Sequence, residues 1–178
     1  DGVPPVAVAV TAPAHWGPAA IGALRGALRA SPVLSPGGFP PIIVSDAAAA
    51  LAAVQAAPGL PGSGVVALCD FGGSGSSITL ADARANLAPI GETIRIADFS
   101  GDRIDRDLLE QVLAGIGTAD QEETGRTTAI GALTRLREEC RLAKERLSTE
   151  TATTLPVDLP TYRADVRLTR AELDAVIA

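Results

Sequence analysis

The sequence predicts a mixed α/β fold in which sheets of short strands are flanked by helices. Two observations carry this prediction. Short apolar runs rich in Val and Ile, which are typical of strands, recur along the chain. Between them lie segments with apolar residues spaced three and four positions apart, which is typical of amphipathic helices. At 178 residues the chain has room for one domain of moderate size or two small lobes.

The N-terminal part predicts the order strand, helix, strand, helix. The strand "VAVAVTAPA" ends near Pro13, and the following segment has Ile21, Leu24 and Leu28 at helical spacing. Ser45 or Asp46 can serve as the N-cap of the second helix. The predicted elements are a strand at 6–14, a helix at 17–30, a strand at 42–45 and a helix at 46–57. The segment "PGLPGSG" then reads as a linker.

The rest of the chain predicts a hairpin or meander, two helices, two strands and a last helix. The strongest helical pattern places Leu133, Leu136, Cys140, Ala143 and Leu147 on one face. In the last helix Thr169 and Glu172 have the spacing of a capping box. The predicted strands are 65–70, 77–82, 93–100, 151–159 and 162–168, and the predicted helices are 105–117, 128–148 and 169–178.

Composition excludes several classes of function. The net charge of -6 argues against a nucleic-acid partner, because binding to phosphate backbones needs clustered Lys and Arg. His15 is the only histidine, which argues against a His/Cys zinc site and a serine triad. Cys69 and Cys140 predict reduced core residues in a cytoplasmic compartment. No segment is long and apolar enough to predict a membrane span, so we expect no membrane partner.

The segment "CDFGGSGSSITL" is the candidate for chemistry. A buried strand is predicted to end at Asp70, and Gly72, Gly73 and Gly75 allow the backbone to turn with its N–H groups on one side. A carboxylate beside such an anion-binding nest favours a metal-bound nucleotide over a bare anion. A plain glycine-containing hairpin loop explains the same residues. Neither a Walker loop nor a G-x-G-x-x-G helix start is present.

Several segments, in order, resemble the nucleotide-binding domain of the Hsp70 chaperone family, within the actin-like ATPase superfamily with its ribonuclease H-like fold. "VAVTAPAHW" resembles V-T-V-P-A-Y-F, "IIVSDAAAALAA" resembles I-N-E-P-T-A-A-A, and "CDFGGSGSSITL" resembles the phosphate loop D-L-G-G-G-T-F-D-V-S. "FSGDRIDRDLL" is similar to G-G-E-D-F-D-N-R-L, and "LREECRLAKERLSTET" to L-R-x-x-C-E-x-A-K-R-x-L-S. The resemblance covers nearly the whole chain.

The resemblance implies a division of the chain between two lobes of that fold. Residues 1–62 match the second half of lobe I, 63–118 the start of lobe II with its phosphate loop, and 119–178 the outer subdomain of lobe II. The first phosphate loop and the closing adenosine segment of the family have no counterpart here. We therefore expect the chain to be a fragment of a longer protein.

The resemblance also implies which residues bind Mg²⁺ and ATP or ADP. Asp70 matches the family's metal-site aspartate, and Asp46 matches a glutamate that orders metal-bound water, although an ordinary helix N-cap explains Asp46 equally well. These two are the predicted catalytic residues, with Asp70 as the metal ligand. The predicted cofactor-binding residues are Gly72, Gly73, Ser74, Gly75, Lys144 and Ser148.

Departures from the family pattern leave two functions open. The family's loop threonine and second aspartate fall at Gly75 and Ser77, and its adenosine-helix glutamate and arginine fall at Arg141 and Glu145, with both signs of charge exchanged. One hypothesis is an ATPase that couples hydrolysis to a conformational change toward a client protein or co-chaperone. The alternative is a degenerate pseudo-ATPase with a regulatory or scaffolding role. A polymerising or sugar-kinase relative is disfavoured, because the segment "LREECRLAKERLS" at 136–148 resembles the chaperone branch.

Overall fold

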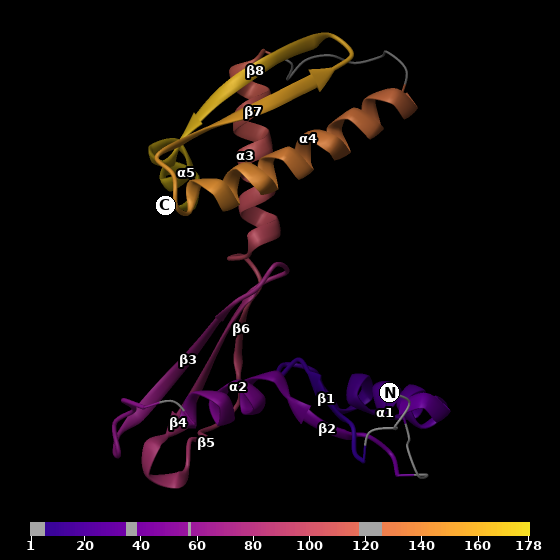
Figure 1. Ribbon diagram of the computed structural model, residues 1–178, viewed down its shortest axis with the longest axis vertical. Coiled ribbons are helices and arrows are strands. Elements are labelled where there is room, and N and C mark those ends of the chain that lie inside the picture. The colour runs from indigo at the N-terminus through magenta and orange to yellow at the C-terminus, as the bar shows by residue number, and fades with distance from the viewer. Residues whose placement is uncertain (1–5, 35–38, 57, 118–125) are drawn as a thin grey trace. The chain divides into compact units, whose positions relative to one another are not determined.

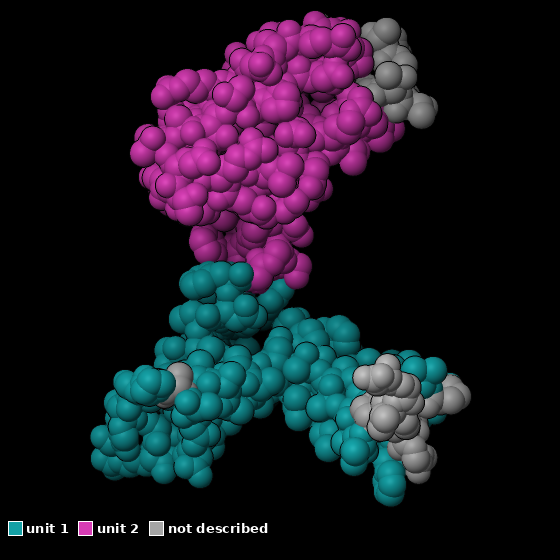
Figure 2. All heavy atoms as spheres, viewed as in Figure 1, with its two compact units in different colours: residues 1–71, 76–96 teal, residues 72–75, 97–178 magenta. Residues whose placement is uncertain are grey.

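The computed structural model describes residues 6–34, 39–56, 58–117 and 126–178. The chain forms two compact units, one of residues 1–71 and 76–96 and the other of residues 72–75 and 97–178, which are coloured separately in Figure 2. The glycine loop 72–75 therefore belongs to a different unit from the strands that it connects. The predicted boundary at 118 lies outside the described residues, and the predicted division into lobes stays a prediction.

The N-terminal half of the first unit has the predicted strand, helix, strand, helix order (Figure 1). Strands β1 and β2 pair in parallel, with Ala9 opposite Ile42, which is the arrangement that a connecting helix allows. Pro18 occupies the first turn of α1, where its missing N–H costs nothing. The elements are β1 (Ala9–Ala12), α1 (Pro18–Arg29), β2 (Ile42–Ser45) and α2 (Asp46–Gln55), with a short 3₁₀ turn at Pro32–Leu34.

The second half of the first unit is the predicted meander. Strand β4 pairs antiparallel with β3, with Asp70 opposite Ser77, and also with β5 and β6. Leu51 of α2 packs with Ala81 of β4 and with Leu87 in a small buried cluster. The elements are β3 (Val65–Phe71), β4 (Ser76–Asp82), a 3₁₀ turn (Ala83–Ala85), β5 (Ala88–Pro89) and β6 (Ile94–Ile96).

The prediction of a buried strand before the glycine loop is wrong. Strand β3 pairs with β4 alone in the described part of the chain, and most of its side chains are exposed, including Val65 and Phe71. Cys69 is also exposed, so the prediction that it is a core residue is wrong, whereas Cys140 is fully buried as predicted. An apolar run on the last strand of a sheet gives the same sequence signal as a buried central strand.

The second unit contains the larger core. Helices α3 and α4 pack against each other, and α4 packs on the β7–β8 hairpin (Figure 1). The predicted face of α4 is buried at Leu136, Cys140, Ala143 and Leu147, whereas Leu133 is 38% exposed. The elements are α3 (Gly101–Gly115), α4 (Arg126–Leu147), β7 (Ala152–Leu159), β8 (Tyr162–Thr169) and α5 (Arg170–Ile177).

The helix ends follow the predicted chemistry with one difference. Thr169 and Glu172 form the predicted capping box at the start of α5. Helix α3 begins at Gly101 rather than at Asp105, because Ser100 is its N-cap and accepts a hydrogen bond from Arg103 N–H at 3.1 Å. Among the helices of the described residues, none is long and apolar enough to cross a membrane.

Candidate functional site

Asp46 is fixed at the start of α2 by backbone amides. Ser45, the last residue of β2, is the N-cap of this helix, because its side chain accepts a hydrogen bond from Ala48 N–H at 3.1 Å. Asp46 Oδ1 accepts hydrogen bonds from Ala47 N–H at 2.6 Å and from Ala14 N–H at 2.8 Å. Of the two predicted N-cap candidates, Ser45 and Asp46, Ser45 is the cap. Asp46 instead connects the helix to the segment after β1.

Asp70 lies on the face of the sheet that α2 covers. Alternate residues of a strand face the same side, so Val66, Leu68 and Asp70 share one face of β3. Val66 and Leu68 pack against the small cluster around Leu51. Asp70 continues this row one step beyond the apolar cluster, and it is exposed. The strand thus carries an acid to the polar end of the face on which the helix packs.

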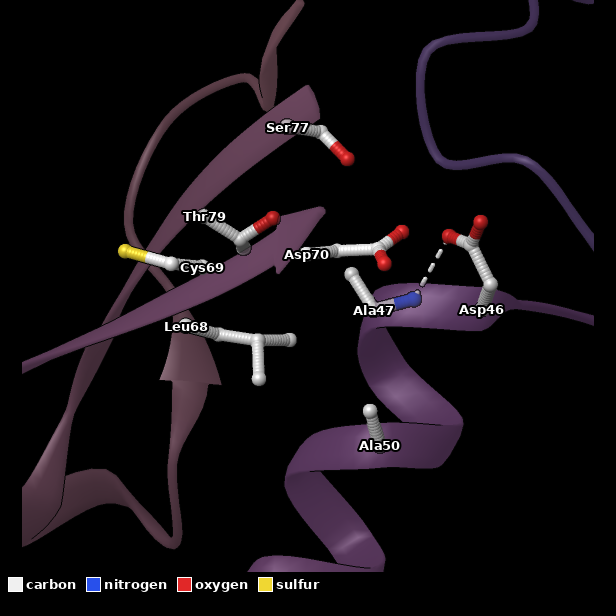
Figure 3. Close-up of a pocket in the computed structure, with 8 residues that line it drawn as sticks. All are labelled: Asp46, Ala47, Ala50, Leu68, Cys69, Asp70, Ser77 and Thr79. Atoms are coloured by element: carbon white, nitrogen blue, oxygen red, sulfur yellow. Dashed lines mark hydrogen bonds between the residues drawn. The ribbon is translucent and has the colours of Figure 1, made fainter. Parts of the chain in front are cut away.

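A pocket of about 370 Å³ separates the start of α2 from the ends of β3 and β4. Figure 3 shows the carboxylates of Asp46 and Asp70 pointing toward each other across it, with the hydroxyls of Ser77 and Thr79 on the strand side. The pocket lining is Asp46, Ala47, Ala50, Leu68, Cys69, Asp70, Ser77 and Thr79. Two acids and no basic side chain line this pocket, so it favours a cation.

Ser77 and Thr79 are pocket residues that the sequence analysis did not select. Strand pairing explains both positions, because Ser77 lies opposite Asp70 and Thr79 lies opposite Leu68 in the antiparallel register. Thr79 is buried, and its hydroxyl is within 2.8 Å of the Thr93 hydroxyl. A sequence signal existed in the alternation of polar residues at 77 and 79, two positions apart on one predicted strand.

The donors of this pocket fit Mg²⁺ bound together with phosphate. Magnesium is usually held by one or two carboxylates, while water and substrate phosphates complete its coordination. Asp70 and the second oxygen of Asp46 supply such carboxylate donors. Within the described residues no group of three or more His, Cys, Asp or Glu side chains is placed to hold a metal ion by itself.

The glycine loop is a tight turn between β3 and β4. Gly72 N–H donates to Gly75 carbonyl oxygen at 3.0 Å, so this amide is used inside the turn. A Cβ on Gly72 would lie 2.9 Å from the Gly75 oxygen, closer than real Cβ contacts come, so glycine is required at this position. Gly73 is exposed, and its amide has no hydrogen-bond partner among the described residues. Gly73, rather than Gly72, thus presents an available N–H.

The carbonyl groups of this loop cap helix α3. Gly101 N–H donates to Gly72 oxygen at 3.1 Å, and Asp102 N–H donates to Gly73 oxygen at 2.8 Å. The first N–H groups of a helix have no partner within the helix, so such bonds stabilise its start. Together with the Ser100 cap they leave the first turn of α3 fully bonded. The loop therefore has a structural role in the second unit besides any role in binding.

A second pocket, of about 250 Å³, lies beside Ser74 of the glycine loop. It is lined by Ser74, Ala97, Asp98, Ser100, Asp102, Arg103, Arg106 and Arg137. Arg103 is paired with Asp107 at 2.8 Å, and the hydrogen bond that its guanidinium donates to Asp107 raises the pKa of Arg103. The sequence analysis did not select these arginines, because the pocket joins residues of α3 and α4 that are distant in the sequence.

Lys144 lies in the last turn of α4 and Ser148 directly follows this helix, but within the described residues their contacts are internal. Lys144 Nζ is 2.6 Å from Asp105 Oδ1 and donates to Gly101 oxygen at 3.2 Å. Ser148 is exposed, and its hydroxyl donates to Lys144 oxygen at 3.3 Å. Asp105, which the sequence analysis placed at a helix start, is in fact buried inside α3. Its burial is possible because Lys144 neutralises it.

Arg141 and Glu145, the two positions of exchanged charge on α4, form an ion pair with each other, and Arg141 also pairs with the neighbouring Glu138. The Arg141 guanidinium contacts both Glu138, at 2.6 Å, and Glu145. The hydrogen bond with Glu138, followed by the charges of Glu138 and Glu145, raises the pKa of Arg141. All three side chains are well exposed. They form a surface cluster on the helix in which the cation is shared by two acids.

The parallel strand pair, the meander and the flanking helices define a mixed α/β protein, which is consistent with a fragment of the actin-like ATPase fold. The family model described as Hsp70 protein matches residues 41–178 of the chain. The chain therefore belongs to the Hsp70 family. No curated protein matches it. Family membership indicates a nucleotide-binding chaperone function, and Hsp70 proteins generally bind ATP or ADP with Mg²⁺.

Proposed function

We propose that the full-length protein binds Mg-ATP and couples its hydrolysis to a conformational change in a chaperone-like protein. The observation that carries the proposal is the pair of carboxylates, Asp46 and Asp70, that face one pocket with no basic side chain in its lining. Two acids directed at one cavity repel each other, and a divalent cation relieves that repulsion. The family match to residues 41–178 supports the nucleotide as the ligand that brings the cation.

Each acid has a distinct part in this proposal. Asp70 is exposed and would be the direct metal ligand. Asp46 Oδ1 is held by two amides, so its other oxygen has a fixed direction from which to orient a water molecule. When bound, Mg²⁺ supplies charge neutralisation for the phosphates. Because hydrogen bonds from two backbone amides hold the Asp46 carboxylate in place, little reorganisation is needed when the ligand enters.

The phosphate-binding part of the proposal rests on the glycine loop. The exposed Gly73 N–H is a free donor, and Arg106 and Arg137 line the pocket beside Ser74. Backbone amides and guanidinium groups are the donors that proteins commonly use for phosphate oxygens. We propose Gly72, Ser74 and Gly75 as the residues that shape this loop around the phosphates.

The proposal extends to the wider protein. We infer that residues 1–62 and 63–178 are parts of two lobes whose closure changes the affinity for a client protein or co-chaperone, in a cytoplasmic setting. Ser148 is proposed at the nucleoside end of the ligand, whereas the ammonium of Lys144 is engaged by Asp105 and Gly101. The exchanged charges at Arg141 and Glu145 make this the weakest point of nucleotide recognition, because a cation shared by two acids is a poor hydrogen-bonding partner for a further ligand.

Calorimetric titration of the full-length protein with Mg-ATP, combined with a turnover assay, tests the proposal. Asp70→Asn keeps the size of the side chain and removes its charge, so we expect Mg-ATP affinity to fall by about tenfold or more. Glu92→Gln is the matched control, since Glu92 is exposed on the same unit and lies outside the pocket. Turnover and affinity that are the same in Asp70→Asn and wild type would eliminate the assigned site.

The second candidate is a pseudo-ATPase that binds nucleotide without hydrolysing it. Two observations favour it. Gly75 and Ser77 stand where the family has a hydroxyl and a carboxylate in the loop, and Arg141 is engaged by Glu138 and Glu145. The same experiment separates the two candidates. Mg-ATP binding that depends on Asp70 without measurable turnover would identify the regulatory or scaffolding role, whereas Asp70-dependent turnover would identify the ATPase.

A further inference from the structure

Lys144 lies at the centre of a network that joins helix α4 to the glycine loop. Its ammonium is 2.6 Å from Asp105 Oδ1 and 3.2 Å from the carbonyl oxygen of Gly101, the first residue of α3. Helices α3 and α4 pack against each other (Figure 1). Lys144 is the only lysine in the sequence. A single side chain of α4 therefore fixes both the first turn of α3 and an acid one turn further along.

The ion pair is shielded from solvent. The side chain of Asp105 is 5% exposed and that of Lys144 is 20% exposed. Neighbouring Cys140 is fully buried, and burial, followed by the nearby charge of Asp105, raises the pKa of its thiol to about 12. Charges in such surroundings interact strongly and keep a fixed geometry, unlike surface pairs. The position of the Lys144 ammonium is therefore well determined.

The first turn of α3 also holds the glycine loop in place through backbone hydrogen bonds. Gly101 N–H and Asp102 N–H donate to the carbonyl oxygens of Gly72 and Gly73, respectively. A Cβ on Gly101 would lie 3.4 Å from Lys144 Nζ and 3.5 Å from Gly73 Cα. An added methyl group at Gly101 would therefore touch both the lysine and the loop, which shows that both lie close to the helix start. A displacement of the Gly101 peptide group would move the atoms to which the loop is bonded.

We propose that Lys144 is a positioning residue, which sets the conformation of the glycine loop through Gly101 instead of contacting the nucleotide directly. The proposal rests on the function proposed above in so far as the loop binds phosphate. The ammonium forms an ion pair with Asp105 and donates a hydrogen bond to the Gly101 oxygen. The loop can present the Gly73 N–H only while its own carbonyls remain bonded to α3, so nucleotide affinity depends on Lys144 at a distance.

Amide hydrogen exchange in the full-length protein, measured without nucleotide, tests the positioning role directly. We expect Lys144→Met to speed exchange of the Gly101 and Asp102 amides about tenfold, since their acceptors would no longer be held in place. Exchange at Val112, deep in the same helix, should change little. The matched control is Arg135→Met, because Arg135 is an exposed basic residue of α4 outside the network. Mg-ATP affinity is measured on the same variants.

A double variant separates positioning from stability. Replacing both charges, as in Lys144→Met with Asp105→Leu, removes the unpaired buried acid and is expected to recover most of the thermal stability. Fast exchange of the Gly101 and Asp102 amides should nevertheless persist, because no ammonium reaches the Gly101 carbonyl. Recovery of slow exchange in the double variant would overturn the proposal, since the ion pair would then act only through stability.

The remaining outcomes also decide the question. Asp105→Asn, which keeps the lysine, should speed exchange at the same two amides if the acid holds the ammonium in place. Reduced Mg-ATP affinity in Lys144→Met with unchanged exchange would show direct contact and overturn the proposal. If wild-type protein fails to bind Mg-ATP, the proposed function is lost, but the exchange data still decide whether Lys144 positions the loop.

Discussion

The two units of the chain bury very different amounts of apolar surface. The second unit has a cluster of twelve buried residues drawn from α3, α4, α5 and the β7–β8 hairpin, whereas the main cluster of the first unit has three. In the first unit β3 exposes large apolar side chains such as Val65 and Phe71. Stability in the second unit therefore comes from its own core, and the first unit has far less apolar burial to hold it.

The acidic residues of the two units also differ in burial and in whether they have a charged partner. Asp105 of the second unit is buried and paired with Lys144, so its charge is used within the fold. Asp70 of the first unit is exposed and faces a pocket that contains a second acid and no base. A charge that has a fixed partner contributes to structure, whereas a charge directed at a cavity is available to a ligand. This comparison is the physical basis for proposing a metal site in the first unit.

Truncating one core leucine in each unit should give the largest effect and test this comparison. We expect Leu108→Ala in the second unit to lower the free energy of unfolding by about 3 to 4 kcal/mol. Leu51→Ala in the first unit should cost about 2 kcal/mol, because its smaller cluster can relax around the lost side chain. Denaturant unfolding measures both, with Trp16 reporting the first unit and Tyr162 the second, since each is unique in the chain.

The control for this pair is Leu133→Ala, on a 38% exposed position of α4. Its cost should stay well below that of Leu108→Ala, since little burial is lost. Equal costs for Leu108→Ala and Leu51→Ala would contradict the difference between the cores. If the Trp16 and Tyr162 transitions have the same midpoint in every variant, the two units unfold together.

A pH effect should distinguish the two cysteines. Burial raises the pKa of Cys140 to about 12 from an ordinary value of 9.0, so the folded state keeps this proton when the unfolded state has lost it. Stability from Cys140 is therefore full below about pH 8 and falls as pH rises toward 12, by about 1.4 kcal/mol between pH 8 and pH 10. Unfolding free energies of wild type and Cys140→Ala, measured between pH 8 and pH 10, check this slope.

Thiol reactivity gives an independent reading of the same contrast. The native protein should react with a thiol reagent at exposed Cys69 and spare buried Cys140, and denatured protein should react at both. Cys69→Ser should remove the native reaction. Rapid labelling of Cys140 in the native protein would contradict the packing of α4 on α3, and a pH slope that survives in Cys140→Ala would assign it to another group.

Much of the fold follows from the sequence because its signals are local. The apolar spacing of α4, the capping box of Thr169 and Glu172 and the strand and helix order of the first unit depend only on neighbouring residues. The exposure of β3 and Cys69 was not predictable in this way, because an apolar run does not show which strands lie beside it. The early start of α3 was missed for the same reason, since part of its cap comes from the distant glycine loop.

The candidate site was predictable only in part. The resemblance singled out Asp46, Asp70 and the glycine loop, and the structure directs both acids into one pocket. Whether they bind a metal stays a prediction. The place of Thr79 in the pocket depends on the register of two strands. The ion pair of Lys144 depends on the packing of two helices. Neither feature is encoded by neighbouring residues in the sequence. Contacts between distant segments are the information that the sequence analysis lacked.

Within the acidic pocket the two acids should differ in their effect on stability. Asp46→Ala removes the acceptor of two backbone amides, so we expect a loss of about 1 kcal/mol in the free energy of unfolding. Asp70→Asn should change it by less than about 0.5 kcal/mol, because Asp70 is exposed. Trp16-monitored denaturation measures both. A larger cost for Asp70→Asn than for Asp46→Ala would mean that Asp70 is a structural residue.

The smallest effect is expected at the exposed charge cluster of α4, where Arg141 is shared by Glu138 and Glu145. Arg141→Ala should lower the Tm by no more than about 2 °C, since exposed helix pairs contribute little. Added salt should reduce this difference further, because surface charges are screened. Thermal melts of wild type and Arg141→Ala at low and high salt provide the measurement. A large, salt-independent loss would place Arg141 with Lys144 among the fixed charges of the second unit, and the contrast between buried and exposed pairs would then fail.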